Sequence, residues 1–320
     1  MSTLPPAVAG ITWRPATLGD IPEVANLAAA VDEIEGLEFV GGPEFWNWWF
    51  RQHDLASDTL LAIDEDAAVI GLAGSYFTDS EIGARAILWL DSHPDRLDLE
   101  PLLLAWAVAR AREQVSSSSH PDKVLRVSAE EHRTRRRNLL EAEGFIKART
   151  FVDMERSLTG DLPDPRPAPE GITVVPWTPD LDEPARLVSN AAFRSHWGSL
   201  PMDAETWAAM GIDPGAMRRD CSFIAVAGDE AIAICLAEVE QEDDPTKLLI
   251  PRVGTRPDWQ RRGLASILLT TTLHAAAETG FLTSTLTVDE ESRSGATAVY
   301  ADLGYRVTSR SITYVLEASS

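Results

Sequence analysis

The sequence predicts two copies of one α/β (α+β) domain, each built on a mixed, mostly antiparallel sheet flanked by helices. The 320 residues are enough for two domains of ordinary size. Between them, residues 158–171 read LTGDLPDPRPAPEG, with four prolines and no helical or strand periodicity, which is typical of an extended linker. We therefore expect domains at residues 10–157 and 172–318, joined by a proline-rich linker at 158–171.

An internal repeat supports this division. Three blocks of the first half recur in the second half in the same order and at a nearly constant offset, which indicates a tandem duplication. The matching blocks are GITWRP (10–15) with GITVVP (171–176), LLAIDEDAAVIGLAG (60–74) with FIAVAGDEAIAICLA (223–237), and EGF (143–145) with LGY (303–305).

The second copy shows the order of elements most clearly. Short β-branched or apolar runs predict strands, and apolar residues at helical spacing predict helices. Gly228 and Asp229 are typical hairpin-turn residues. In order we expect a strand at 172–175, a helix through Leu181–Ala192, a hairpin of 223–227 and 231–239, a strand at 247–255, a helix at 264–279, a strand at 282–288, a helix at 295–303 and a last strand or hairpin at 305–316.

Composition excludes several classes of protein. The chain has 28 basic and 50 acidic residues, a net charge of −22 spread over both halves. Such a chain is repelled by nucleic acids and anionic membranes, so we expect neither partner. No secretory signal is visible, and the longest apolar stretch, near Leu102–Ala109, is too short to span a bilayer. Cys221 and Cys235 are too few for a disulfide framework or a zinc site. We expect a soluble cytoplasmic protein without a metal.

The segment Leu248–Leu269 is the most informative. A predicted strand runs into a loop holding Gln260–Ala265, and a helix begins there. Unpaired amides and the helix dipole make such a helix start a site for a phosphate or pyrophosphate. Nearby arginines add positive charge to an acidic domain; they are Arg252, Arg256, Arg261 and Arg262. The alternative interpretation is a plain turn with a solvated arginine pair.

This segment resembles the GNAT superfamily of acetyl-CoA-dependent acetyltransferases, whose signature is a strand, [R/Q]xxGx[G/A] and a helix. Residues 288–305 also resemble the downstream pattern V(D/x)xxNxx(G)AxxLYxxLGF. The resemblance implies that the loop binds the CoA pyrophosphate and that the preceding strand binds the pantetheine arm. The matching loop positions are Gln260, Arg261, Arg262, Gly263, Leu264, Ala265 and Ser266, and the strand positions are Val253, Gly254 and Thr255. Ser292 stands where the family usually has Asn. Because Ser has fewer hydrogen-bond donors, we expect weaker binding of pantetheine there. Across its whole length, the chain is similar to tandem GNAT proteins.

The resemblance also implies that Tyr300 is the general acid that protonates the CoA sulfur. The alternative for Tyr300 is simple packing on an apolar helix face. For the general base, Glu240 ends a predicted strand beside Glu238 in the acidic run 238–244. That run could instead be only a solvated turn. His196 is more typical of a structural residue, and Cys221 and Cys235 are expected to pack in the core.

The first copy lacks these features. The counterpart of the phosphate loop lies within residues 88–106, which contain no glycine, and Asp95, Asp98 and Glu100 stand where amides should face phosphate. Leu140 takes the place of Tyr300. We therefore expect the first domain to be degenerate and not to bind CoA. A basic cluster, RTRRR at 133–137, is expected to be a solvated, ion-paired helix face.

Together these observations predict an acetyl-CoA-dependent N-acetyltransferase whose C-terminal domain acts on the primary amine of a small molecule. We expect a monomer or a weak dimer. Two alternatives stay open, namely a protein N-acetyltransferase and a non-catalytic acyl-CoA sensor or interaction module.

Overall fold

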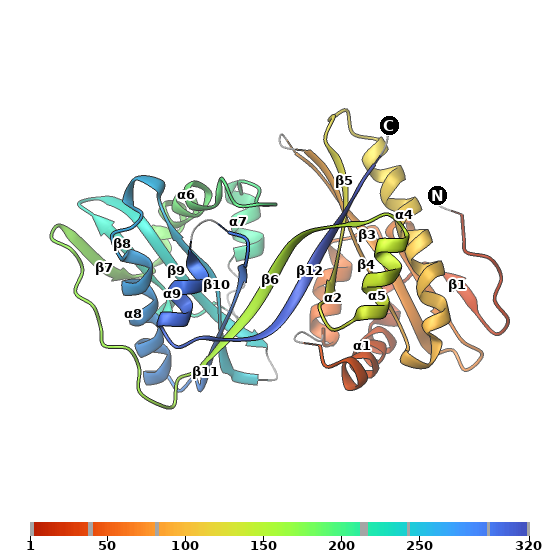
Figure 1. Ribbon diagram of the computed structural model, residues 1–320, viewed down its shortest axis with the longest axis horizontal. Coiled ribbons are helices and arrows are strands. Elements are labelled where there is room, and N and C mark those ends of the chain that lie inside the picture. The colour runs from red at the N-terminus through yellow and green to blue at the C-terminus, as the bar shows by residue number, and fades with distance from the viewer. Residues whose placement is uncertain are drawn as a thin grey trace. The chain divides into compact units, whose positions relative to one another are not determined.

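The computed structural model describes residues 3–37, 41–80, 83–211, 217–241, 244–292 and 295–318. It divides into two compact units: unit 1 contains Met1–Thr150 and Ser311–Ser320, and unit 2 contains Phe151–Arg310. The chain passes from unit 1 to unit 2 within strand β6 and returns within strand β12 (Figure 1).

Unit 1 has the strand order β1-β2-β3-β4-β5-β12. The pairing is antiparallel except between β4 and β5, which are parallel. Its strands are β1 (Thr12–Arg14), β2 (Thr59–Ile63), β3 (Val69–Ser80), β4 (Gly83–Ser92), β5 (Lys123–Glu130) and the end of β12 (Arg306–Glu317). Its helices are α1 (Ile21–Glu35), α2 (Pro43–Arg51), α3 (Leu55–Asp58), α4 (Glu100–Ser116) and α5 (Thr134–Ala142).

Unit 2 repeats this arrangement in the order β6-β11-β10-β9-β8-β7. Again a single pair, β10 with β11, is parallel and the others are antiparallel. Its strands are the end of β6 (Ile146–Ser157), β7 (Ile172–Pro176), β8 (Phe223–Ala227), β9 (Glu230–Gln241), β10 (Asp244–Thr255) and β11 (Thr283–Asp289). Its helices are α6 (Asp182–Phe193), α7 (Ala204–Gly211), α8 (Leu264–Glu278) and α9 (Ala296–Asp302). The predicted fold class and the hairpin turn at Gly228 and Asp229 are confirmed.

Helices cover both faces of each sheet. Alternate strand residues point to opposite sides, and here both sets are apolar, so each face needs a helix to bury it. In β2, Leu60 and Ala62 pack in the core beneath α4, whereas Leu61 and Ile63 pack with α1. Unit 2 follows the same rule: Ala233 and Cys235 of β9 pack with α8, and Ile234 packs with α6. No helix in the described part of the chain is long and apolar enough to cross a membrane.

The ends of the units differ from the expected boundaries. Val152 and Met154 of β6, expected in the first domain, lie in the core of unit 2. Conversely, Ile312 and Tyr314 of β12, expected in the second domain, lie in the core of unit 1. Each sheet therefore contains a strand end from the other copy of the repeat.

Candidate active site

Strands β10 and β11 of unit 2 separate in a way that opens the sheet. They are hydrogen-bonded only where Lys247–Leu249 faces Thr283–Thr285. Beyond this point β10 continues to Thr255 along β9, after a bulge between Leu249 and Arg252, and β11 continues to Asp289 along β6. The two inner edges therefore have backbone groups that can pair with an extended, amide-containing ligand.

The predicted strand residues lie on the β10 side of this opening. Val253 and Thr255 are half-buried, and Gly254 is buried. A Cβ at Gly254 would lie 3.0 Å from Ala192 Cβ and 3.2 Å from the Phe193 ring. Gly254 is therefore required for close packing of α6 on the sheet, a role the sequence alone did not indicate.

Beyond β10, the chain turns sharply into α8. Gly263, the residue before the helix, has φ +78°, and Arg261 has φ +60°, a conformation that non-glycine residues rarely adopt. The helix begins with the bond from Ile267 N–H to the Gly263 carbonyl at 3.1 Å. The amides of Leu264, Ala265 and Ser266 precede that bond, so they are the unsatisfied donors of the helix start.

Side chains around this loop fix its shape. Gln260 Nε2 donates to the Thr255 carbonyl at 3.2 Å, and the Arg262 guanidinium lies 4.5 Å from the Trp259 ring. Arg256 pairs with Glu230. Because Arg261 and Arg262 are exposed, the loop combines unsatisfied amides with two cationic side chains, the chemistry that binds a pyrophosphate.

Arg252 does not belong to this loop, contrary to the sequence interpretation. Its guanidinium bonds Ser189 Oγ at 3.3 Å and lies 5.7 Å from the Trp207 ring and 5.9 Å from the Phe193 ring. Burial lowers the pKa of Arg252, and the carboxylate of Glu238 opposes that shift. The side chain faces α6 and α7, an environment that the spacing of arginines could not reveal.

Tyr300 lies on α9 and is 9% exposed. Burial raises the pKa of its phenol above the ordinary value, and the nearby Cys235 adds to this effect. Its neighbour Tyr305, 6.0 Å away between ring centroids, bonds Ser284, but the Tyr300 hydroxyl has no hydrogen-bond partner within the described residues. Tyr300 is therefore a protonated hydroxyl that is available to a ligand.

The two glutamates on β9 lie on one face of the sheet. Thr285 Oγ1 on β11 donates to Glu240 Oε1 at 3.0 Å, so Glu240 reaches across β10 toward the strand on its other side. Glu238 lies near Arg252. In the rest of the acidic run, Asp244 accepts a hydrogen bond from Thr246, and residues 242 and 243 lie outside the described residues.

Ser292 lies in the turn after β11, where its amide donates to the Asp289 carbonyl.

Other candidate residues have structural surroundings. His196 follows α6 with its ring 4.8 Å from that of Phe193. Cys221 and Cys235 are completely buried, as expected. Burial raises the pKa of the Cys235 thiol to about 12 and raises that of Cys221 above its ordinary value.

Unit 1 has the same strand opening, but a side chain occupies it. β4 and β5 pair only from Ala84–Leu88 with Lys123–Val127. Past that point Arg136, at the start of α5, donates to the Leu90 carbonyl at 2.6 Å and to Asp91 Oδ1 at 2.9 Å. It also donates to Glu100 Oε1, in the first turn of α4, at 2.7 Å.

These contacts correct the interpretation of the basic cluster. Arg133 and Arg136 are not a solvated face, because their side chains are each only 5% exposed. Burial opposes the charge of Arg136, but Asp91 and Glu100 outweigh it and raise the pKa of Arg136 above its ordinary value. The sequence missed this network because its partners come from β4 and α4, far away along the chain.

Comparison with known proteins agrees with this geometry. Residues 185–305 match the Acetyltransferase (GNAT) family. This segment of unit 2 is therefore similar to a GNAT acetyltransferase domain. The matched segment begins within α6 and includes the open strand pair, the loop before α8, and α9.

The sequence of the chain is 32% identical over 205 residues to the mycothiol acetyltransferase of Streptomyces coelicolor, covering 61% of this chain and 62% of that protein. The chain thus spans about three fifths of the length of the first curated relatives it matches.

Solved structures extend the likeness to the whole chain. A GCN5-related N-acetyltransferase from Sphaerobacter thermophilus superposes with a TM-score of 0.79 and 25% identity, covering 99% of this chain and 98% of that one. A tandem GNAT protein from the clavulanic acid biosynthesis pathway superposes with a TM-score of 0.75 and 16% identity, covering 97% and 99%. The predicted GNAT fold is therefore confirmed for the chain.

Proposed function

We propose that the chain is an acetyl-CoA-dependent N-acetyltransferase that acts on the primary amine of a small molecule, with its active site in unit 2. The observation that carries the proposal is the open β10–β11 pair leading into the glycine-capped start of α8. Val253, Gly254 and Thr255 would pair with the pantetheine arm. The loop Gln260–Gly263 and the first turn Leu264–Ser266 would hold the pyrophosphate. Ser292 would contact the pantetheine from the β11 side.

In this proposal, acetyl-CoA supplies the acetyl group as a thioester. Groups of the protein transfer the protons and stabilise the negative charge. An alkylammonium has a pKa of about 10, so a base must take its proton before the nitrogen can attack. Glu240, fixed by Thr285, is the proposed base, acting directly or through water. The nitrogen then attacks the thioester carbonyl, and a backbone amide near Val253 stabilises the negative oxygen of the tetrahedral intermediate. The C–S bond breaks as the carbonyl re-forms, and Tyr300 protonates the leaving sulfur. The nitrogen loses its second proton to water, and Tyr300 regains a proton from water.

We further propose that unit 1 does not bind acetyl-CoA. The support is the Arg136 guanidinium, which bonds the Leu90 carbonyl on the strand edge that a pantetheine arm would use. Its partner Glu100 puts a buried carboxylate into the first turn of α4. A second anion there would face that carboxylate, whereas the counterpart in unit 2 is the apolar Leu264.

The name of the curated relatives, mycothiol acetyltransferase, supports a small-molecule acceptor. The test is a turnover assay of the full chain with acetyl-CoA and a panel of small primary amines, with a lysine-containing peptide as the protein-like acceptor. We expect acetylated small amine and free CoA in equal amounts. Acetylation of the peptide alone would contradict the proposed acceptor class, and acetyl-CoA binding without turnover on any amine would contradict catalysis.

A further inference from the structure

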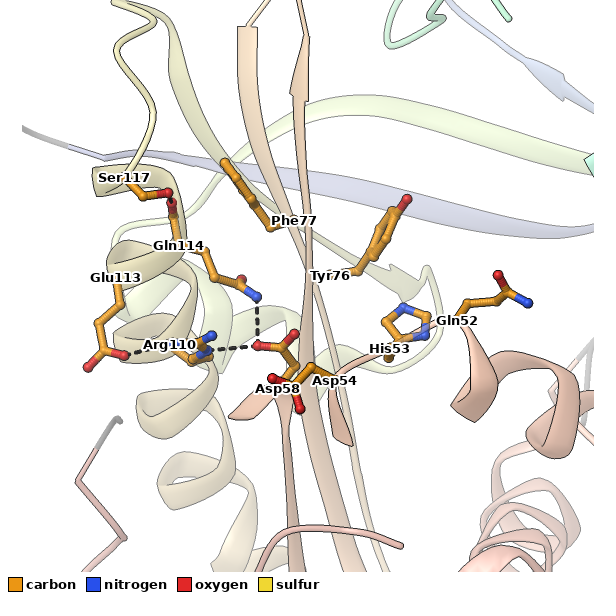
Figure 2. A pocket seen from close by; sticks show the side chains of 10 residues that line it. All are labelled: Gln52, His53, Asp54, Asp58, Tyr76, Phe77, Arg110, Glu113, Gln114 and Ser117. Atoms are coloured by element: carbon orange, nitrogen blue, oxygen red, sulfur yellow. Dashed lines mark hydrogen bonds and ion pairs between the residues drawn. The ribbon is translucent and has the colours of Figure 1, made fainter. Parts of the chain in front are cut away.

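Unit 1 contains a pocket of about 440 Å³ that lies away from the Arg136 network (Figure 2). It lies along the edge of β3, next to the first residue of β2. Because β2 begins at Thr59, opposite Gly74, the part of β3 after Gly74 has no partner strand on that side among the described residues. The pocket is walled by residues 52–58, by β3, and by the C-terminal half of α4. Its size is that of a small-molecule site.

The equivalent place in unit 2 is covered by the chain itself. There Met217 forms a β-bridge to Glu238 on the corresponding strand, β9. The Ala237 amide donates to Ser222 Oγ at 2.9 Å, and the Arg218 amide donates to the Ala237 carbonyl at 2.9 Å. The pocket is therefore a feature of unit 1 and not a general consequence of the fold.

A rigid polar network forms one wall. Arg110 Nε and Gln114 Nε2 both donate to Asp58 Oδ1, at 2.8 and 2.9 Å, as Figure 2 shows. Gln114 is 8% exposed, and its amide oxygen accepts from Ser75 Oγ at 2.6 Å. Arg110 also donates to Glu113 at 3.0 Å. Arg110 Nε and Nη1 and Gln114 Nε2 are therefore engaged with the protein, while Asp58 Oδ2 has no hydrogen bond from the described residues.

The opposite wall also presents acceptors. His53 Nδ1 lies 2.6 Å from the Trp49 carbonyl, which can only accept, so Nδ1 carries the proton of the neutral ring. Burial lowers the pKa of His53 and favours that neutral form. Its Nε2 is then a buried acceptor without a partner in the described structure, and the exposed carboxylate of Asp54 also lines the pocket.

Aromatic side chains complete the lining. Tyr76 and Phe77 are adjacent on β3, and the Tyr76 ring lies 5.0 Å from that of His53. Aromatic faces attract cations and pack against alkyl chains. The pocket thus combines unused acceptors, three carboxylates against one arginine, and aromatic surface.

We propose that this pocket binds a small organic cation whose N–H groups donate to these unused acceptors, such as a primary alkylammonium. The ammonium would bind between Asp58 Oδ2 and Asp54, and its alkyl chain would lie against the exposed ring of Tyr76. This site is separate from the proposed acceptor site, because all of its residues belong to unit 1.

The test uses 1,4-diaminobutane as the probe and 1,4-butanediol as the uncharged control, titrated calorimetrically into the full chain without acetyl-CoA. We expect the diamine to bind and the diol not to bind. Asp54→Asn should weaken binding about fivefold, the scale of one exposed ion pair. Asp66→Asn, which removes another exposed carboxylate of unit 1 that lies outside the pocket, should leave the affinity unchanged.

Two more variants separate this site from the acceptor site. Tyr76→Ala removes a side chain that is 43% exposed, so the fold should persist while diamine affinity falls. Glu240→Gln changes the proposed base in unit 2 and should leave this binding unchanged. Affinity lost in Glu240→Gln but kept in Asp54→Asn and Tyr76→Ala would place the diamine in unit 2 and overturn the proposal. Equal binding of the diol, or no binding of the diamine, would overturn it as well.

Discussion

Tyr300 is the residue on which the proposed chemistry depends most directly. It is buried on α9, its pKa is raised by that burial, and its hydroxyl has no partner in the described structure. A proton held this firmly is present throughout the neutral pH range and can be given only to a strong base such as a leaving thiolate. The family resemblance predicted the residue, whereas its burial and free hydroxyl required the structure.

Tyr300→Phe should lower kcat by about a hundredfold, because general acid catalysis typically contributes at least that factor. The acetyl-CoA affinity should stay close to that of the unaltered chain, since the ring and its packing remain. Steady-state kinetics and a binding titration measure the two effects. An unchanged kcat would show that Tyr300 only packs against the helix face.

Both cysteines should be unreactive in the folded chain. Burial raises the pKa of Cys235 to about 12 and raises that of Cys221, so at pH 8 each thiolate fraction is below that of a free cysteine. We expect no thiol titre with Ellman's reagent in the native chain, and two thiols after denaturation. The reactive thiolate fraction rises only as pH climbs toward these elevated pKa values. A fast-reacting native thiol at pH 8 would contradict this burial and make a covalent acetyl-cysteine intermediate chemically accessible.

At the scale of elements, the loop before α8 illustrates what a sequence can and cannot predict. The motif at Gln260–Ala265 correctly predicted a strand, a loop and the start of a helix. It did not predict the positive φ of Arg261 or the role of Gly254 beneath α6, because both depend on how the loop and helix pack in three dimensions. The Arg136 network was missed for the same reason.

Gly263→Ala should weaken acetyl-CoA binding at this loop. Alanine at φ +78° costs about 1 kcal/mol and tends to move the amides away from the ligand. Gly280→Ala is the matched control, because Gly280 has φ +94° just beyond the other end of α8 and an added Cβ also meets open space. Both variants should lose similar thermal stability, and only Gly263→Ala should lose affinity for acetyl-CoA. Equal affinity losses would indicate a general effect on the fold.

At the scale of the whole molecule, the repeat predicted two units of one fold but not their exact composition. Sequence similarity between the copies does not determine which sheet receives the last strand. The structure places Ile312 and Tyr314 in unit 1, where the Tyr314 hydroxyl donates to Glu141 at 3.1 Å. Unit 1 therefore depends on the C-terminal end of the chain.

Ending the chain after Arg310 should destabilise unit 1 selectively. The truncation removes the part of β12 that pairs with β5, together with the buried side chains of Ile312 and Tyr314, a loss of at least about 3 kcal/mol. Hydrogen exchange should show faster exchange in β3, β4 and β5 and retained protection in β9 and α8. Ending the chain after Ala318 is the control and should change neither unit. Equal loss in both units would contradict this assignment of strands.

The central claim is that the chain has one acetyl-CoA site, at the open β10–β11 pair and the start of α8. The most direct test is calorimetric titration of the full chain with acetyl-CoA. We predict one site per chain, abolished by Gly263→Asp, which adds a carboxylate where the pyrophosphate should bind. Two sites per chain would show that the Arg136 network does not close unit 1, and one site that survives Gly263→Asp would place the ligand elsewhere.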